Sequence, residues 1–150
     1  MVALRPAADV DVAALHMIAT AAYERYVPRI GRPPAPMTAD YAHAVRSGQA
    51  WVEVEHGEIV GFAILIAQAG HLLLENIAVL PAAQGQGIGS SLLALAENQA
   101  RSLHLSEIQL YTNEAMTENL AYYPRHGYIE THRVEQDGFQ RVFFRKRVIS

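Results

Sequence analysis

Residues 76–90 read NIAVLPAAQGQGIGS, and this stretch decides the fold. The residues before Pro81 are apolar, as in a buried strand, whereas an amphipathic helical pattern runs from Ile88 to Leu103. Three glycines alternate in the loop between them. Glycine permits positive φ angles and lets a ligand touch the backbone, and the N–H groups at a helix N-terminus attract an anion. The stretch therefore predicts a strand–loop–helix unit that binds a phosphate or pyrophosphate.

Two other interpretations of the glycine loop stay open. An ordinary strand–helix connection would use glycine only for tight packing. A Rossmann dinucleotide site has the pattern Gly-x-Gly-x-x-Gly, but here the third glycine, Gly89, comes one residue too soon and the unit follows an antiparallel hairpin. A P-loop is excluded, because Lys146 is the only lysine and follows no glycine-rich turn.

The residues before this unit predict two helices and then strands. Apolar residues repeat at helical spacing from Val12 to Ala22, and the period changes to two at Trp51. The expected elements are a strand at Val2–Arg5, a helix capped by Asp9, a loop over residues 28–36, a helix from Thr38 to about Ser47, a hairpin over residues 49–56 and 59–68, and a strand at His71–Val79. The four prolines of residues 28–36 are the reason to expect a loop there.

The residues after the unit predict a βαββ ending. A fifth regular strand contains Ile108 and Leu110, a short helix covers Asn119–His126, and a hairpin over 128–136 and 139–148 turns at Asp137-Gly138. Strands that precede one βαβ unit favour the α/β class, with a mixed sheet and helices on both faces. No linker or repeat interrupts the chain, so we expect a single domain over residues 1–150.

Composition limits the function. The chain is 51% hydrophobic and 18% charged, which is typical of a globular protein. A net charge of −3 argues against a nucleic-acid partner, and the apolar runs are too short to span a membrane. Without cysteine there are no disulfides, and the histidines lack metal-binding spacing, so we expect a cytoplasmic protein without a metal.

Two motifs together resemble the GNAT superfamily of N-acetyltransferases. Gln84, Gly87 and Gly89 match its signature Gln/Arg-x-x-Gly-x-Gly/Ala, and Tyr123–Tyr128 fits its Tyr-x-x-x-Gly-aromatic element. Tyr123 follows Gly87 by 36 residues, a spacing similar to that of the family. The resemblance covers nearly the whole chain. It implies the GNAT fold, in which a mostly antiparallel sheet is split between its fourth and fifth strands and acetyl-CoA enters the wedge.

The resemblance also implies how this co-substrate is held. Its pyrophosphate would bind the loop amides, and its pantetheine arm would pair with the end of the fourth strand like an added strand. The amide of Val79 would face the thioester carbonyl. The expected cofactor-binding residues are Ile77, Ala78, Val79, Gln84, Gly85, Gln86, Gly87, Ile88, Gly89, Ser90 and Asn119. The family often has an asparagine seven residues before the tyrosine, where Met116 stands, whereas Asn119 lies four before it.

Tyr123 is the candidate acid that protonates the leaving thiolate, because a phenol can donate a proton or a hydrogen bond to sulfur. The alternative is a tyrosine that only packs, a role that the adjacent Tyr122 could also fill. Pro124 departs from the family pattern. It is expected to keep Tyr123 out of the α region and to shorten or kink the helix.

Glu75 is the candidate base, since desolvation in an apolar strand would raise its pKa. The alternative is a carboxylate paired with an arginine on a neighbouring strand or helix. By the period of two, His71 shares the face of Glu75 and could relay a proton, or it could be an edge residue.

These residues predict an acetyl-CoA-dependent N-acetyltransferase. The acceptor would be a primary amine of a small molecule, peptide or protein, and it would attack directly in a ternary complex. A CoA- or acyl-CoA-binding sensor or regulatory module without turnover is the alternative. Arginines 25, 29 and 32 around the proline-rich loop could bind a substrate carboxylate or simply be solvated. The C-terminal hairpin offers edges for a possible homodimer.

Overall fold

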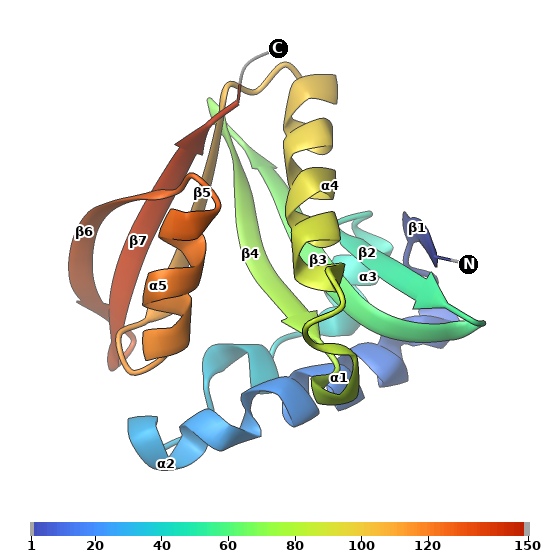
Figure 1. Cartoon of the computed structure of the whole chain (residues 1–150), viewed down its shortest axis with the longest axis horizontal. Coiled ribbons are helices and arrows are strands. Elements are labelled where there is room, and N and C mark those ends of the chain that lie inside the picture. The colour runs from blue at the N-terminus through green and yellow to red at the C-terminus, as the bar shows by residue number, and fades with distance from the viewer. Residues whose placement is uncertain (1, 149–150) are drawn as a thin grey trace.

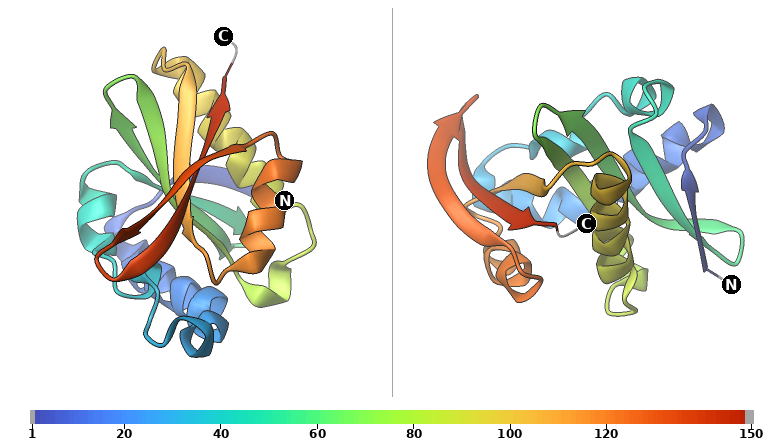
Figure 2. Two further views of the ribbon diagram at one scale, coloured as in Figure 1. Left: turned by 90° about the vertical axis from the view of Figure 1, so that its left-hand side faces the viewer. Right: turned by 90° about the horizontal axis from the view of Figure 1, so that it is seen from above.

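The computed structural model describes residues 2–148 and contains a seven-stranded sheet in the order β1-β2-β3-β4-β5-β7-β6. The strands are β1 (Val2–Pro6), β2 (Ala50–Glu55), β3 (Glu58–Gln68), β4 (His71–Val79), β5 (Glu107–Asn113), β6 (Ile129–Gln136) and β7 (Phe139–Arg147). Only β4 and β5 pair in parallel, and the other neighbours are antiparallel. Figure 2 shows β1 at one end of the curved sheet and the β6–β7 hairpin at the other. The predicted mixed, mostly antiparallel sheet is confirmed.

The sheet is split where the sequence predicts. β4 and β5 pair only at Leu72 with Ile108 and at Leu73 with Gln109. Beyond these pairs the two strands diverge, with β4 running toward α1 and β5 toward α5 (Figure 1). Among residues 2–148, the edge of β4 from Leu74 to Val79 therefore has no strand partner on the β5 side, and we call the opening between the two strands the wedge.

Helices cover both faces of the sheet, as predicted. The helices are α1 (Val12–Tyr23), α2 (Val27–Ile30), α3 (Tyr41–Arg46), α4 (Ile88–Ser102) and α5 (Thr117–Arg125), with short 3₁₀ turns η1 (Asp9–Asp11), η2 (Glu24–Tyr26), η3 (Ala35–Met37) and η4 (Pro81–Ala83). One buried cluster joins α1 and α3 to β2 and β3, and a second joins α4 to β4, β5 and β7. Within the described residues, no helix is both long and apolar enough to span a bilayer.

The predicted starts of two helices are wrong. Asp40, not Thr38, caps α3, and its carboxylate accepts the N–H of His43 over 2.9 Å. Asp9 does not act as a cap, because Ala8 stands at that position and η1 already begins at Asp9. An aspartate satisfies a free N–H of the first helical turn as well as a threonine does, so the choice depends on where the chain bends.

Residues 28–36 are not wholly a loop either. Pro28 lies in the first turn of α2, where a missing N–H removes no helical hydrogen bond. Ala35 to Met37 form a 3₁₀ turn. Proline density here ends the regular structure after one turn rather than preventing it.

A β-bulge in β4 sets the geometry of the wedge. Ile64 pairs with Asn76 and Leu65 with Leu74, so Glu75 is an extra residue between them. The extra residue reverses the alternation of faces, because Leu74 packs in the α4 cluster whereas Ala78 packs in the α1 cluster. Glu75 and Asn76 thus lie where β4 changes face, just beyond its last pairs with β5.

Candidate functional site

Two cavities meet in the wedge. One, of about 350 Å³, is lined by the β4 bulge, the proline-rich segment, β5 and β7, and we call it the bulge pocket. The other, of about 440 Å³, is lined by the glycine loop, the end of β4 and α5, and we call it the loop pocket. Tyr23, Ile77, Asn119 and Tyr123 line both. A ligand in one pocket can therefore meet a ligand in the other at these four residues.

The loop pocket contains a backbone anion site. Gly87 caps α4 with a φ of +82° and without a side-chain hydrogen bond to the helix. The first N–H groups of α4 have no acceptor within the helix, and its first turn carries no acidic residue. A Cβ at Gly85 or Gly87 would meet no atom within 4 Å, so the space above both is open. The arrangement suits a phosphate or pyrophosphate group.

All the predicted cofactor-binding residues except Gln86 line the loop pocket. The carbonyl oxygens of Ile77 and Val79 accept hydrogen bonds from the side chains of Tyr23 (2.8 Å) and Gln84 (3.4 Å), so they point away from β3. The N–H and C=O of one strand residue point to the same side. The N–H of Val79 therefore faces the wedge, where a pantetheine chain or a thioester carbonyl could accept it.

Gly89 lets α5 approach α4. A Cβ at Gly89 would lie 2.6 Å from the hydroxyl of Tyr122, and this hydroxyl hydrogen-bonds the side chain of Ser90. Any larger residue would displace Tyr122. The last glycine of the motif thus serves packing between the two helices, while Gly87 serves the loop.

The predicted effect of Pro124 on Tyr123 is wrong. α5 starts at Thr117, before the predicted Asn119, and both Tyr123 and Pro124 are helical. Because Pro124 is one residue from the end of α5, the helix loses only a hydrogen bond of its last turn. Gly127, with a φ of +90°, ends it: its own N–H bonds the carbonyl of Pro124, and that of Tyr128 bonds the carbonyl of Tyr123, both over 3.1 Å. This Schellman motif explains the four-residue offset from tyrosine to glycine.

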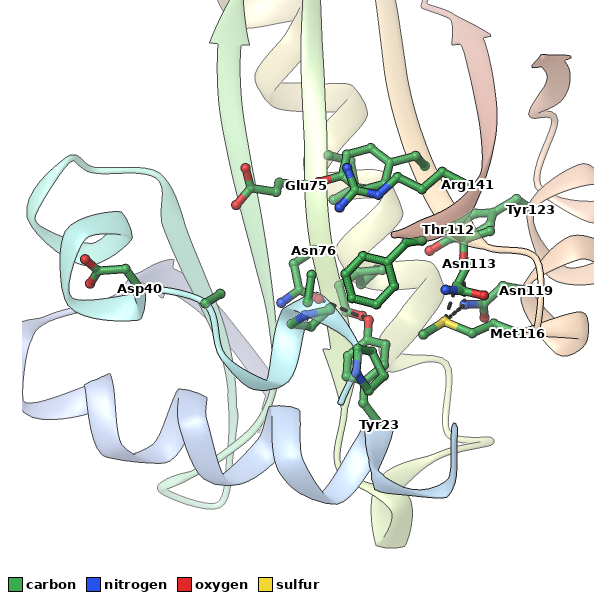
Figure 3. Close-up of a pocket in the computed structure, with 18 residues that line it drawn as sticks. Tyr23, Asp40, Glu75, Asn76, Thr112, Asn113, Met116, Asn119, Tyr123 and Arg141 are labelled. Atoms are coloured by element: carbon green, nitrogen blue, oxygen red, sulfur yellow. Dashed lines mark hydrogen bonds between the residues drawn. The ribbon is translucent and has the colours of Figure 1, made fainter. Parts of the chain in front are cut away.

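The side chain of Tyr123 is 6% exposed and packs between Tyr128 and Phe144, with ring centroids 5.7 and 5.8 Å apart. Within residues 2–148 its hydroxyl has no hydrogen-bond partner, and the residue lines both pockets, of which Figure 3 shows the bulge pocket. Burial raises the pKa of Tyr123, and the neighbouring Tyr122 raises it further. Tyr123 is therefore a phenol that stays protonated and can act as a hydrogen-bond donor at the junction of the pockets.

Glu75 lines the bulge pocket and is absent from the loop pocket. Desolvation raises the pKa of its carboxyl, and His43 partly offsets this. No ion pair to Glu75 forms within the described residues, so the alternative of an arginine partner is wrong. His71 lies at the other end of β4, where it acts on the pKa of Glu107, and it lines neither pocket. The structure does not bring His71 and Glu75 together.

A buried hydrogen-bond chain beside the junction was not foreseen. The hydroxyl of Tyr23 donates to Asn76 Oδ1 (3.0 Å) and to the carbonyl of Ile77 (2.8 Å), while Asn76 Nδ2 donates to the Tyr41 hydroxyl (2.7 Å). Tyr41 in turn donates to the carbonyl of Pro36 (2.5 Å). Burial raises the pKa of Tyr23, so this donor stays protonated. The signal in the sequence was the asparagine within an apolar strand.

The arginines around the proline-rich segment form bridges across the wedge. Arg29 pairs with Glu118 of α5 through contacts of 2.7 and 3.1 Å, and Arg25 lies 3.8 Å from the same carboxylate. The hydrogen bond from Arg29 lowers the pKa of Glu118 to about 2. Arg32 stacks on Phe139 at 3.6 Å. Arg29 and Arg32 thus connect the segment after α1 to α5 and to the β6–β7 hairpin.

Asn119 connects the two pockets from α5. Its side-chain amide donates to Thr112 Oγ1 over 3.0 Å and contacts the sulfur of Met116 at 3.6 Å. Asn119 therefore lies at the junction despite its shifted position in the sequence, with its amide directed at β5.

Comparison with known proteins agrees with this geometry. The sequence model of the acetyltransferase (GNAT) family matches residues 12–128. An aminoalkylphosphonate N-acetyltransferase of Salmonella typhimurium is 36% identical over 86 residues, which is 53% of this chain and 55% of that protein. The match thus spans about half the length of this curated relative.

Solved structures share the fold over almost the whole chain. The ribosomal-protein-S18-alanine N-acetyltransferase from Escherichia coli superposes with a TM-score of 0.79 at 20% identity, covering 100% of this chain and 96% of that one. The PaiA N-acetyltransferase from Thermoplasma acidophilum, solved in complex with coenzyme A, gives 0.77 at 16% identity over 98% and 99%. By its family match and its fold, this chain belongs to the acetyltransferase (GNAT) family of acyltransferases.

Proposed function

We propose that the chain is an acetyl-CoA-dependent N-acetyltransferase whose acceptor is a primary amine, of a small molecule or of a peptide or protein. The junction of the two pockets supports this most directly, because Tyr23, Ile77, Asn119 and Tyr123 border both. Direct transfer needs donor and acceptor to be bound together and to touch. The loop pocket suits the donor, and the bulge pocket suits the acceptor.

The loop pocket fits a CoA thioester on three observations. In the part of the chain that the structure describes, the first α4 amides have no acceptor within the helix, the space above Gly85 and Gly87 is open, and the β4 edge at Ile77–Val79 has no strand partner on the β5 side. The thioester supplies an activated acetyl carbon. The N–H of Val79 would polarise its carbonyl.

Two side chains would transfer protons in the reaction, the Glu75 carboxylate as the base and the Tyr123 hydroxyl as the acid. The neutral amine nitrogen attacks the thioester carbon and forms the C–N bond. The Glu75 carboxylate, directly or through water, accepts the proton that this nitrogen then loses and returns it to solvent, while the C–S bond breaks. The Tyr123 hydroxyl donates to the leaving thiolate, and solvent restores its proton. The net products are an acetylated amine and a free thiol.

The names of two similar proteins indicate which kind of acceptor to test. One acts on aminoalkylphosphonates, which are small amines, and another on the alanine of a ribosomal protein. Both are primary amines, which fits a pocket that Glu75 lines and that meets the loop pocket at the junction.

Thiol release from acetyl-CoA, measured with a panel of amines against water alone, tests the proposal. Amine-dependent release, with the acetylated amine identified by mass spectrometry, is the expected result. Tight binding of acetyl-CoA with no release above the water rate for any small amine or peptide would instead make the chain a binding module.

A further inference from the structure

We propose that the bulge pocket selects a compact primary amine that also carries an anionic group, a carboxylate or a phosphonate, and that Arg141 binds this group. The proposal rests on the proposed N-acetyl transfer and names the substrate class for the same site. Two observations support the proposal: the charged side chains on the walls of the pocket, and the contacts that close the pocket.

Arg141 is held in place by two aromatic rings and a neutral side-chain amide. It projects from β7 into the bulge pocket (Figure 3). Its guanidinium lies 4.4 Å from the ring centre of Tyr111 and 5.6 Å from that of Phe139, and Nη1 donates to Gln136 over 2.9 Å. Within residues 2–148 no carboxylate forms an ion pair with it. The remaining donors of this rigid fork suit a carboxylate or phosphonate.

The opposite wall carries the opposite charge. Glu75 lines the pocket from the β4 bulge, and Arg141 lines it from β7. Burial is the largest effect on the pKa of Tyr111 and raises it, while Arg141 lowers this pKa and Glu75 raises it, so Tyr111 lies within electrostatic range of both. A molecule with a cationic amine and an anionic group matches these walls when its amine faces β4 and the junction and its anion faces β7.

The pocket is closed in a way that favours a compact acceptor. Arg32 stacks on Phe139 and donates to the carbonyl of Asp137, so the proline-rich segment contacts the β6–β7 hairpin on one side. The ion pair of Arg29 with Glu118 joins the same segment to α5 on the other. A volume of about 350 Å³ lies at the lower end for small-molecule sites. An extended peptide would have to break one of these bridges.

The test compares kcat/KM for three acceptors of similar size: aminoethylphosphonate, β-alanine and neutral n-propylamine. The wild-type chain should prefer the anionic amines over n-propylamine by roughly 10- to 100-fold, the range of a charge-assisted hydrogen-bonded contact. The two anionic acceptors show whether a phosphonate or a carboxylate fits better. Arg141→Gln should bring the preference close to one, and Arg141→Lys should restore part of it.

Arg145→Gln is the matched control, because Arg145 lies on the same strand, pairs with Glu107 and lines neither pocket. It should keep the preference. A wild-type preference near one, a preference that survives Arg141→Gln, or a peptide that outperforms all three amines would each overturn the proposal.

Calorimetric binding of ethylphosphonate, which has no amine, separates this proposal from the proposed function. Heat of binding to the wild type that Arg141→Gln abolishes would support the anion site even if no amine is acetylated. Absence of that heat in the wild type, alongside acetylation of neutral amines, would leave the N-acetyltransferase and remove the anion site.

Discussion

The hydroxyl of Tyr23 donates to the backbone carbonyl of Ile77 over 2.8 Å and so joins the end of α1 to the open edge of β4. The same hydroxyl bonds Asn76 Oδ1, which fixes the bulge. One side chain thus holds the helix, the strand edge and the bulge together at the junction of the two pockets.

Tyr23→Phe should lower the free energy of unfolding by about 1–3 kcal/mol, because it leaves buried acceptors on Ile77 and Asn76 without their donor. In a chain of this size each kcal/mol corresponds to roughly 2–4 °C in Tm. Thermal unfolding measures the loss. Tyr26→Phe is the control, since the single hydrogen-bond partner of its hydroxyl among the described residues is the side chain of Arg25. Equal Tm shifts in the two variants would mean that the Tyr23 bonds contribute nothing specific.

Glu75→Gln should lower kcat/KM by about 10²–10⁴-fold and flatten the acidic limb of its pH profile, because that limb reports the base of the free enzyme. Desolvation raises the pKa of Glu75, so the limb should lie above the ordinary range of a glutamate. Glu58→Gln, an exposed change outside both pockets, should keep the limb. An unchanged limb in Glu75→Gln would assign proton removal to water or to the acceptor's own ionisation.

The same raised pKa predicts a stability effect with a definite sign. The folded chain holds the Glu75 proton to a higher pH than the unfolded chain, whose value is about 4.3. Stability should therefore fall as the pH rises from that value through the folded pKa, and Glu75→Gln should lack this fall. Tm measured across this interval for both proteins checks it.

Gly87→Glu should weaken acetyl-CoA binding by roughly 100-fold, equivalent to about 2.7 kcal/mol, because it puts a negative charge beside the α4 amides. Gly87→Ala is the matched control. It imposes the same strain at a φ of +82° and adds no charge, and its Cβ meets open space. Calorimetry that gives the two variants the same affinity would place the pyrophosphate elsewhere.

Local sequence patterns predicted most of the fold, because the hydrophobic periodicity and the turn residues of a strand or helix lie within that segment. His71–Val79 was predicted with its observed bounds, and the split between the fourth and fifth strands followed from the family resemblance, whereas its start after Leu73 comes from the structure. The bulge at Glu75 could not be predicted. It depends on the register between β3 and β4, and no residue of β4 alone reveals it.

The sequence predicted the part of the site that the backbone of the glycine loop forms. It did not predict the part where side chains from distant segments come together. The glycine loop is recognisable from its own residues, and all of them except Gln86 line the loop pocket. Arg141 lies in β7, far along the chain from Glu75. The two side chains line the same pocket because the folded chain places β7 across the wedge from β4. The residues near the proline-rich segment predict arginines that bind a substrate carboxylate or are solvated, whereas Arg29 pairs with Glu118 of α5, a partner that lies 89 positions further along the chain.

Tyr123→Phe should lower kcat by about 10²–10⁴-fold, because it removes the one hydroxyl proposed to protonate the thiolate. The ring keeps its packing against Tyr128 and Phe144, so Tm should hardly change. Acetyl-CoA affinity should also hold, since the thiolate exists only late in the reaction. Steady-state kinetics at a saturating acceptor, together with calorimetry of acetyl-CoA binding, separates the two quantities.

Two neighbouring tyrosines show whether the loss belongs to Tyr123. The hydroxyl of Tyr128 is buried without a hydrogen-bond partner among the described residues and lines neither pocket, so Tyr128→Phe should leave kcat unchanged. Tyr122→Phe removes the bond to Ser90 at the glycine loop, so it should affect acetyl-CoA binding more than kcat. A large loss of kcat in Tyr122→Phe with full kcat in Tyr123→Phe would shift the acid by one residue. If all three variants keep kcat, solvent protonates the thiolate and Tyr123 only packs the junction.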